Sequence, residues 1–219
     1  VSQEIFTKIY EDLHSAEALN HPFHYTILEK KNDIYQKYIE KRQTYSDNIK
    51  IKTKDALTEK NEKMNRYDKE HRDRYISEIH EYYQSCIRKS IGTENDKRKI
   101  MNLKKERDEF IENPDFREQD IYKKHPNYTF VNNEPMSGDK IRGIRKEIYK
   151  TLGIKIDYEH ILFQMLKRGI GIYIEDMPNE YNWIIQKLLA DKEIGIVISI
   201  AFFIGCPNKA IGCLGFDMK

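Results

Sequence analysis

The sequence predicts a helix-rich α/β protein in which part of a parallel sheet, with flanking helices, carries a long, charged helical hairpin. Two short apolar runs near the carboxyl end, residues 170–174 and 194–198, flank one amphipathic segment. Such runs suit strands that are buried on both faces, as in a parallel sheet. In residues 23–114, by contrast, Lys, Glu, Asp, Asn and Tyr dominate and Gly92 is the only glycine. This composition is typical of long solvated helices.

These observations divide the chain into three parts. We expect a leading helix at 1–22, a charged helical hairpin at 23–114 and a partial α/β module at 115–219. Nine of the ten glycines lie from Gly138 onward, which marks the change from the helical part to the compact part.

The totals exclude few classes of protein. Lys and Arg number 38 against 36 for Asp and Glu, and this near-balance neither supports nor excludes nucleic acid, because local patches decide such binding. No run approaches the roughly 20 apolar residues that span a bilayer, so we expect no membrane partner. The three cysteines (Cys86, Cys206 and Cys213) fit neither a disulfide framework nor a zinc site. Free thiols in a reducing, intracellular compartment are expected, with cytoplasm, nucleus and viral factory all open.

The first helix follows from Ile5, Ile9 and Leu13, which share one helical face, and it ends before Pro22. The chain has no initiator Met and enters a helix at once. We therefore expect it to be part of a longer protein. His21 and His24 have a spacing that metal ligands could use, but an apparent loop with a proline favours exposed histidines.

The hairpin follows from narrow stripes of apolar and tyrosine residues at steps of three, four and seven. Breaks near residues 53–55 and at Gly92 divide it into two or three long helices, packed as an antiparallel hairpin or a loose coiled coil. Tyrosine is so frequent on the stripe that its seam should be less dry than a leucine zipper. His71 and His80 should lie on the surface of this hairpin or in its seam.

The remaining elements follow from local signals. We expect a brief strand at 128–131, a helix at 140–152 between a Ser137 cap and a Gly153 stop, and another helix at 158–168. A helix over 179–189, with Pro178 near its first turn, joins the two apolar runs. Two strands joined by one helix form a parallel crossover. A last strand is expected near the end of the chain.

Motifs for autonomous catalysis are missing from the sequence. It has no GxxxxGK[ST] phosphate-binding loop, no HExxH zinc motif and no GxSxG nucleophile elbow. Gly169-Ile170-Gly171 precedes a strand instead of following one, which argues against a dinucleotide-binding loop.

Charged residues next to the strands are the remaining candidates. Glu175 and Asp176 follow the first strand, where open α/β sheets bind their ligands, although they also complement the dipole of the next helix. Basic residues flank the same unit and could hold phosphate groups, but we favour solvated helix faces for each of them taken singly. They are Arg142, Arg145, Lys146, Lys167 and Arg168.

Residues 166–205 resemble the second RecA-like domain of superfamily-two DExH-box helicases. Arg168-Gly169-Ile170-Gly171 matches the opening of the family's strand, and 196–199 matches the later strand that ends in Ala-Thr. Gly205 lies six residues after Ser199, which is the family's step. The sequence departs from the family where Ile174-Glu175-Asp176-Met177 replaces a His-x-Gly turn. It departs again at 206–209, where Asn208 is one place out of register.

The resemblance implies a partial RecA-like sheet from an ATP-dependent helicase acting on RNA or DNA, with the hairpin as an insertion. Ser199 would approach the nucleic-acid backbone, with Glu175, Asp176 and Arg168 also at the nucleic acid. Gly205 and Asn208 would lie on the nucleotide side of the cleft. ATP and Mg²⁺ would bind the complete protein, whose first RecA-like domain would precede Val1. No catalytic residue is expected, and the chain alone should be inactive.

A non-enzymatic alternative remains open. In it, the charged hairpin docks a protein partner and the α/β part is a plain scaffold. Phosphate-binding and acidic metal-binding motifs in the complete reading frame would distinguish the helicase from this scaffold.

Overall fold

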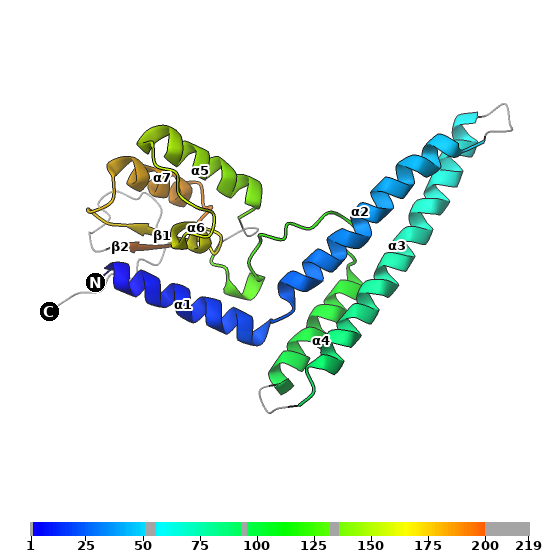
Figure 1. Cartoon of the computed structure of the whole chain (residues 1–219), viewed down its shortest axis with the longest axis horizontal. Helices are drawn as coiled ribbons and strands as arrows, with labels where there is room; N and C mark the ends of the chain where they lie inside the picture. The colour runs from blue at the N-terminus through cyan, green and yellow to red at the C-terminus, as the bar shows by residue number, and fades with distance from the viewer. Residues whose placement is uncertain (1, 51–55, 93–95, 132–135, 200–219) are drawn as a thin grey trace. The chain divides into compact units, whose positions relative to one another are not determined.

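The computed structural model describes residues 2–50, 56–92, 96–131 and 136–199. The chain divides into two compact units (Figure 1). Unit 1 comprises residues 1–18 and 122–219, and unit 2 comprises residues 19–121. The expected hairpin at 23–114 falls within unit 2. Among the described residues, no helix is both long enough and apolar enough to cross a membrane.

Unit 1 is built on a two-stranded parallel sheet. Strands β1 (Ile170–Tyr173) and β2 (Ile196–Ser199) pair in a register that sets Ile170 against Ile196 and Tyr173 against Ser199. Helix α7 (Asn179–Ala190) connects them, so the predicted parallel crossover is confirmed. The helix-rich α/β class is therefore confirmed, and the assignment to a RecA-like sheet stays a prediction.

Helices cover both faces of this sheet (Figure 1). Helix α7 packs on both strands and α5 (Gly138–Leu152) packs on α7, above the strands in this view. Helix α1 (Ser2–Asn20) lies below them and brings Phe6 into the same aliphatic core. Two covered faces explain why both strands are nearly continuous apolar runs.

Helix α5 has the predicted cap and the predicted end, and it begins at Gly138 instead of at the predicted residue 140. The Ser137 side chain accepts a hydrogen bond from the Lys140 N–H, and Gly153 takes a left-handed conformation with φ 67° at the other end. The next helix, α6 (Ile161–Leu166), is shorter than the predicted 158–168. Its N-cap is His160, whose ring accepts from the Leu162 N–H. This cap delays the helix start.

The predicted strand at 128–131 is wrong. Residues Pro126–Tyr128 form a 3₁₀ helix, η1, and the chain then makes one hydrogen bond toward β1, from the Phe130 N–H to the Arg168 carbonyl at 2.6 Å. The reason is that this segment crosses over two glycines. A side chain at Gly195 would overlap the Phe130 carbonyl oxygen, and one at Gly169, where φ is 78°, would overlap the same residue.

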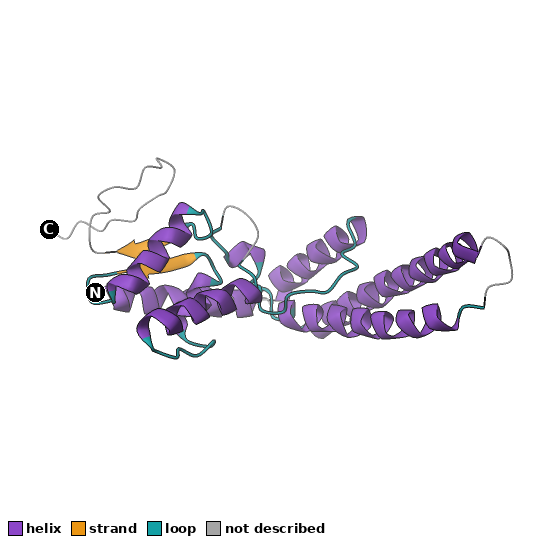
Figure 2. Cartoon of the chain, turned by 90° about the horizontal axis from the view of Figure 1, so that it is seen from above, coloured by secondary structure: helices purple, strands orange, loops and turns teal. Residues whose placement is uncertain are grey.

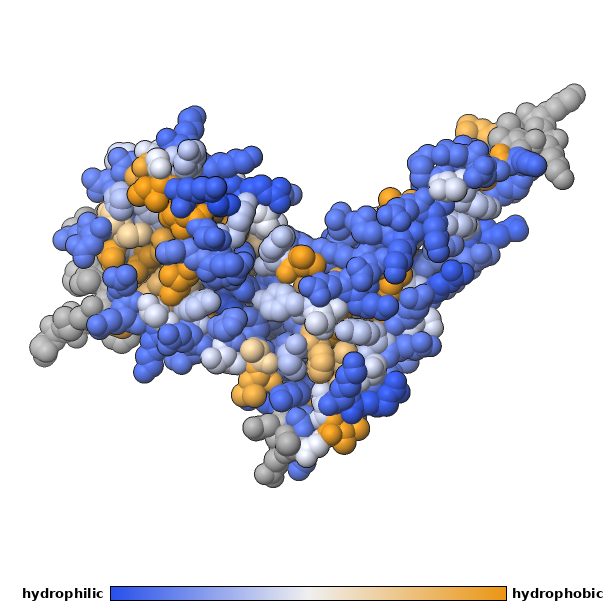
Figure 3. Space-filling view, in the orientation of Figure 1, coloured by the Kyte–Doolittle hydropathy of each residue, from blue (hydrophilic) through white to orange (hydrophobic). Residues whose placement is uncertain are grey.

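The described residues of unit 2 form three long helices, which confirms the predicted two or three. They are α2 (His24–Asn48), α3 (Ala56–Lys89) and α4 (Asp96–Glu112), and both α2 and α4 pack against α3 (Figure 2). The seam is aromatic, as expected: the rings of Tyr67 and His71 stack at 4.0 Å, and Tyr38 packs on both. The surface of α2 and α3 in Figure 3 is mostly hydrophilic.

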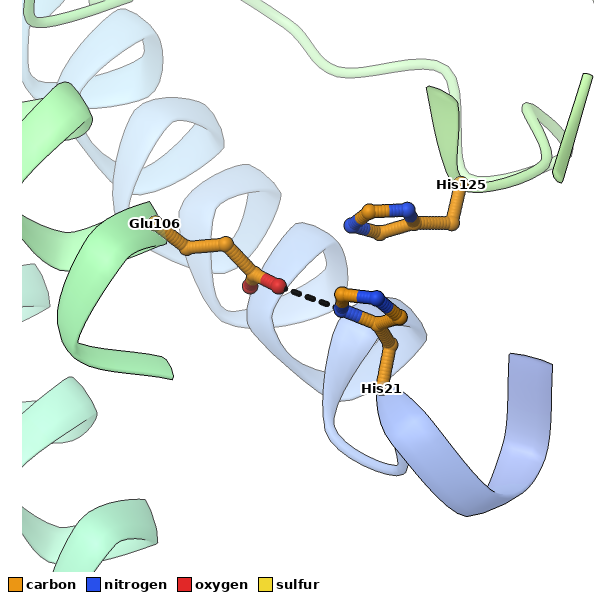
Figure 4. Close-up of side chains that lie close together, drawn as sticks. All are labelled: His21, Glu106 and His125. Carbon is orange, nitrogen blue, oxygen red and sulfur yellow. Dashed lines mark hydrogen bonds and ion pairs between the residues drawn. The ribbon is translucent and has the colours of Figure 1, made fainter. Parts of the chain in front are cut away.

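His21 differs from its expected exposure. Its side chain is buried, and its Nδ1 lies 2.6 Å from Oε1 of Glu106 on α4 (Figure 4). The turn between α1 and α2 is thereby tied to α4 within unit 2. Its partner is 85 residues away in sequence, so the local sequence pattern alone predicts an exposed histidine.

Candidate functional site

The carboxyl edge of the sheet brings together three of the predicted site residues. Because Tyr173 pairs with Ser199, both strands end at the same edge. Ser199 is half-buried there, and Glu175 and Asp176 follow β1 in an exposed loop. Ligands of open α/β sheets bind at this edge.

The loop after β1 is held in place by hydrogen bonds. The Met177 N–H donates to the Ile174 carbonyl at 3.1 Å, closing a turn around Glu175 and Asp176. The side-chain amide of Asn182 donates to the same carbonyl at 2.9 Å. Pro178, the N-cap of α7, makes no side-chain cap. The first N–H groups of α7 therefore lack a side-chain cap at this edge, and such groups favour anions.

Asn182 is a residue that sequence reasoning missed. It is buried on α7, and its Oδ1 has no hydrogen-bond partner among the described residues. A polar residue between Tyr181 and Ile184 on an otherwise apolar face was the available signal. Its amide donates to backbone carbonyl groups of the loop that carries the two carboxylates.

These groups suit a polar ligand with several hydroxyl or phosphate groups. Carboxylates accept hydrogen bonds from sugar hydroxyls and base amino groups, while a serine hydroxyl can donate to a phosphate oxygen. The N-terminus of α7 adds partial positive charge. A nucleic-acid strand offers all of these partners.

Arg168, the fourth predicted residue, lies elsewhere. It precedes β1, at the opposite end of the sheet from Ser199, and its side chain is fully buried. Its Nη2 donates to Oε2 of Glu17 at 2.6 Å, and its Nη1 donates to the Tyr128 carbonyl at 3.3 Å. The guanidinium therefore binds within unit 1 and is separated from the other three residues.

Glu17 completes this buried ion pair. Burial raises the pKa of its carboxyl group, but the His125 N–H, at 2.8 Å, and the Arg168 charge outweigh burial and hold that pKa below its usual value. Nearby, burial lowers the pKa of Lys124 to about 8, and the Arg168 charge lowers it further. The network ties α1 to the start of β1. It was not predictable locally, because Glu17 and Arg168 are 151 residues apart.

The two residues expected at the nucleotide, Gly205 and Asn208, lie outside the described residues, as does the expected last strand. Within each unit taken by itself, the described residues hold no group of three His, Cys, Asp or Glu side chains close enough to share a metal ion. Cys86 is a free, buried thiol in unit 2.

Comparison of the chain with protein-family models, with curated proteins and with solved structures found no match.

Proposed function

We propose that the chain is part of the second motor domain of an ATP-dependent nucleic-acid helicase, and that it grips a strand at the carboxyl edge of its sheet. The observation that carries this proposal is the parallel pairing of β1 and β2 through α7, with Ser199 beside the end of β1. That arrangement supports the strand–helix–strand resemblance and joins three of the four residues expected at the nucleic acid, Ser199, Glu175 and Asp176, at one edge.

Each group at the edge has a role in this proposal. The Ser199 hydroxyl donates to a phosphate oxygen, and the first N–H groups of α7 attract the same anion. Glu175 and Asp176 would repel phosphate, so they accept hydrogen bonds from sugar hydroxyls or base amino groups. A contact to the ribose 2′-hydroxyl would favour RNA over DNA.

ATP hydrolysis belongs to the complete motor in this proposal. The chain has no phosphate-binding loop, so a first motor domain supplies that part, and ATP with Mg²⁺ binds between the two domains. The isolated chain should therefore release no phosphate from ATP in a colorimetric turnover assay. Strong intrinsic turnover by the isolated chain would overturn the assignment.

Photocrosslinking tests the strand-gripping edge directly. The chain is irradiated with single strands that contain 4-thiouridine or 4-thiothymidine, digested with trypsin, and mapped by mass spectrometry. We expect adducts on the peptides 169–187 and 193–209, which contain Glu175, Asp176 and Ser199. Adducts confined to residues 23–114 would contradict this site.

A hydroxyl deletion provides the matched comparison. Ser199→Ala removes one hydrogen bond, which is worth about 0.5–1.5 kcal/mol, so the dissociation constant should rise about two- to tenfold. Ser77→Ala, an exposed serine on α3 of unit 2, is the control and should leave affinity unchanged. Equal affinities for the two variants would count against Ser199.

The scaffold alternative draws on one observation. Unit 2 exposes several apolar side chains, with Ile39 41 % and Met101 63 % exposed, and single residues of this kind could contact a protein partner. Absence of all crosslinks to nucleic acid, together with motif-free flanking sequence, would favour this alternative.

A further inference from the structure

We infer that the outer face of α5 and the loop after it form a basic groove that binds the backbone of a single-stranded nucleic acid, as a second contact away from the sheet edge. This inference rests on the proposed function and extends it. The groove is open to solvent and has a volume of about 490 Å³. The described residues that line it are four basic side chains and two tyrosines, with no acidic one among them: Arg142, Arg145, Lys146, Lys155, Tyr149 and Tyr158.

The pattern of α5 puts these side chains on one face. Ile141, Ile144 and Ile148 are buried against unit 1, so the residues that follow them at helical spacing point outward. Gly153 then turns the chain by its left-handed conformation, and the loop that follows returns Lys155 and Tyr158 to the helix. A solvated helix face alone would not produce a groove.

One wall of the groove is fixed before any ligand arrives. The Arg145 Nε donates to the Ile156 carbonyl at 2.6 Å, and its guanidinium lies 4.2 Å from the centre of the Tyr158 ring. These two contacts hold the loop against α5 while leaving the positive charge of Arg145 in place. Binding then costs little ordering of the wall.

Two lysines are open to an anionic ligand. Lys146 and Lys155 are exposed, and neither has an ion pair among the described residues. Arg142 pairs with Asp139 at 3.0 Å, but both side chains are exposed and such a pair is weak. The groove therefore carries unneutralised positive charge.

A second hollow of about 330 Å³ lies next to the groove, because Arg142 and Tyr158 line both. Lys167 and Glu159 also line this second hollow. Its charge is therefore mixed, and the excess of positive charge lies in the groove on α5.

The tyrosines favour a nucleic acid among polyanions. Tyr149 is 57 % exposed at the groove and offers a ring face on which a base can stack. An acidic peptide would use the lysines without needing such a ring, and a flat membrane surface would not enter the groove. Single strands, whose bases are free to stack, use both features.

Removal of the two open lysines tests the electrostatic part. Fluorescence anisotropy with fluorescein-labelled oligouridylate and oligothymidylate of about 12 nucleotides measures the affinity of the full chain. Lys146→Gln with Lys155→Gln should raise the dissociation constant at least about fivefold at low salt. It should also reduce the slope of log affinity against log salt by about 1.4, at about 0.7 per lost phosphate contact.

Matched controls separate charge from position. Lys150→Gln with Lys187→Gln removes the same charge from exposed positions on α5 and α7 outside the groove, and should leave both affinity and slope unchanged. Tyr149→Ala should weaken binding at least about fivefold through lost stacking, while Tyr149→Phe should restore it.

The results distinguish this groove from the sheet edge. Equal affinity and slope for the two double variants would overturn the groove, even if crosslinks still map to 169–187. Loss of binding in the groove variant without crosslinks at the edge would support the groove and overturn the edge. Loss of binding to phosphatidylserine vesicles, with oligonucleotide affinity unchanged, would assign the groove to membranes and overturn the inference.

Discussion

The two units are stabilised by different chemistry. The core of unit 1 is mainly aliphatic, with Ile141, Ile170 and Ile185 almost fully buried around the sheet. The core of unit 2 is rich in aromatic side chains and includes Tyr75, Tyr83 and Phe110. Aliphatic cores depend on shape alone, whereas buried tyrosines must also satisfy a hydroxyl group.

The hydrogen bonds and ion pairs of the two units also differ. In unit 2 the Tyr75 hydroxyl donates to the Asp115 carbonyl at 3.2 Å, and Asp68 accepts from both Tyr38 and Arg42 near the surface. Unit 1 instead buries one complete ion pair, Glu17 with Arg168. Removing a charged side chain from the surface of unit 2 should therefore change the free energy of unfolding little. Removing one from the interior of unit 1 should lower it greatly.

The largest expected effect is the loss of the buried guanidinium. Arg168→Met removes the guanidinium that forms the buried ion pair with Glu17, so the free energy of unfolding should fall by about 3–5 kcal/mol. Arg42→Met in unit 2 removes an arginine that is 42 % exposed, and should cost about 1 kcal/mol or less. Urea unfolding followed by circular dichroism measures both, and hydrogen exchange assigns the loss to a unit. Equal losses would refute the contrast.

A smaller loss of stability is expected from a substitution at Gly195, over which the segment around Phe130 passes. Gly195→Ala should destabilise unit 1 by about 1–3 kcal/mol, because the new methyl group meets the backbone at Phe130. Gly143→Ala on α5 meets no atom within 4 Å and should instead stabilise the unit by about 0.4–1 kcal/mol. Thermal unfolding distinguishes the opposite signs. If Gly195→Ala leaves the unfolding temperature unchanged, the segment around Phe130 shifts at little cost in free energy.

Two tyrosine-to-phenylalanine changes compare the units directly. Tyr75→Phe removes a hydroxyl that donates a hydrogen bond, and should cost about 0.5–1.5 kcal/mol. Tyr181→Phe in unit 1 removes a buried hydroxyl with no partner among the described residues, and should be neutral or stabilising. Urea midpoints for the two variants should move in different directions or by clearly different amounts.

The smallest expected effect is on the response to acid. The pKa of Glu17 is lowered in the folded chain, so its contribution to stability is present above the ordinary carboxyl pKa and is lost as pH falls through the folded value. Between pH 7 and pH 3, the free energy of unfolding should fall less steeply for the double variant Glu17→Gln with Arg168→Met than for the natural sequence. If the free energy of unfolding falls equally steeply in both proteins, other carboxyl groups control the response to acid.

Local signals account for most of the fold. Caps at Ser137 and Gly153, and two apolar runs around one amphipathic helix, predicted α5, α7 and the parallel sheet. The errors fall where distant residues decide the outcome: Arg168 needs Glu17 from α1, and His21 needs Glu106 from α4. The segment at 128–131 has a strand-like composition, but it lies over two glycines that no pattern in its own sequence reveals.

The candidate site was predictable to the same extent. The resemblance predicted Ser199, and the position after the first strand predicted Glu175 and Asp176. The register of the parallel strands brings the three residues to one edge. The groove on α5 was not predicted, because Lys155 and Tyr158 approach the helix only through the turn at Gly153. Arg142, Arg145 and Lys146 each resembled an ordinary solvated residue when considered singly.

The divided sequence of unit 1 has a consequence for biosynthesis. Glu17 and Arg168 are 151 residues apart, so at about 5–20 residues per second the ribosome needs roughly 8 to 30 s to supply the second after the first. The helices of unit 2 can form while that time passes. Until the second half of unit 1 is synthesised, the apolar face of α1, which includes Phe6, has no core to pack against. Chaperones that shield exposed apolar segments would bind there.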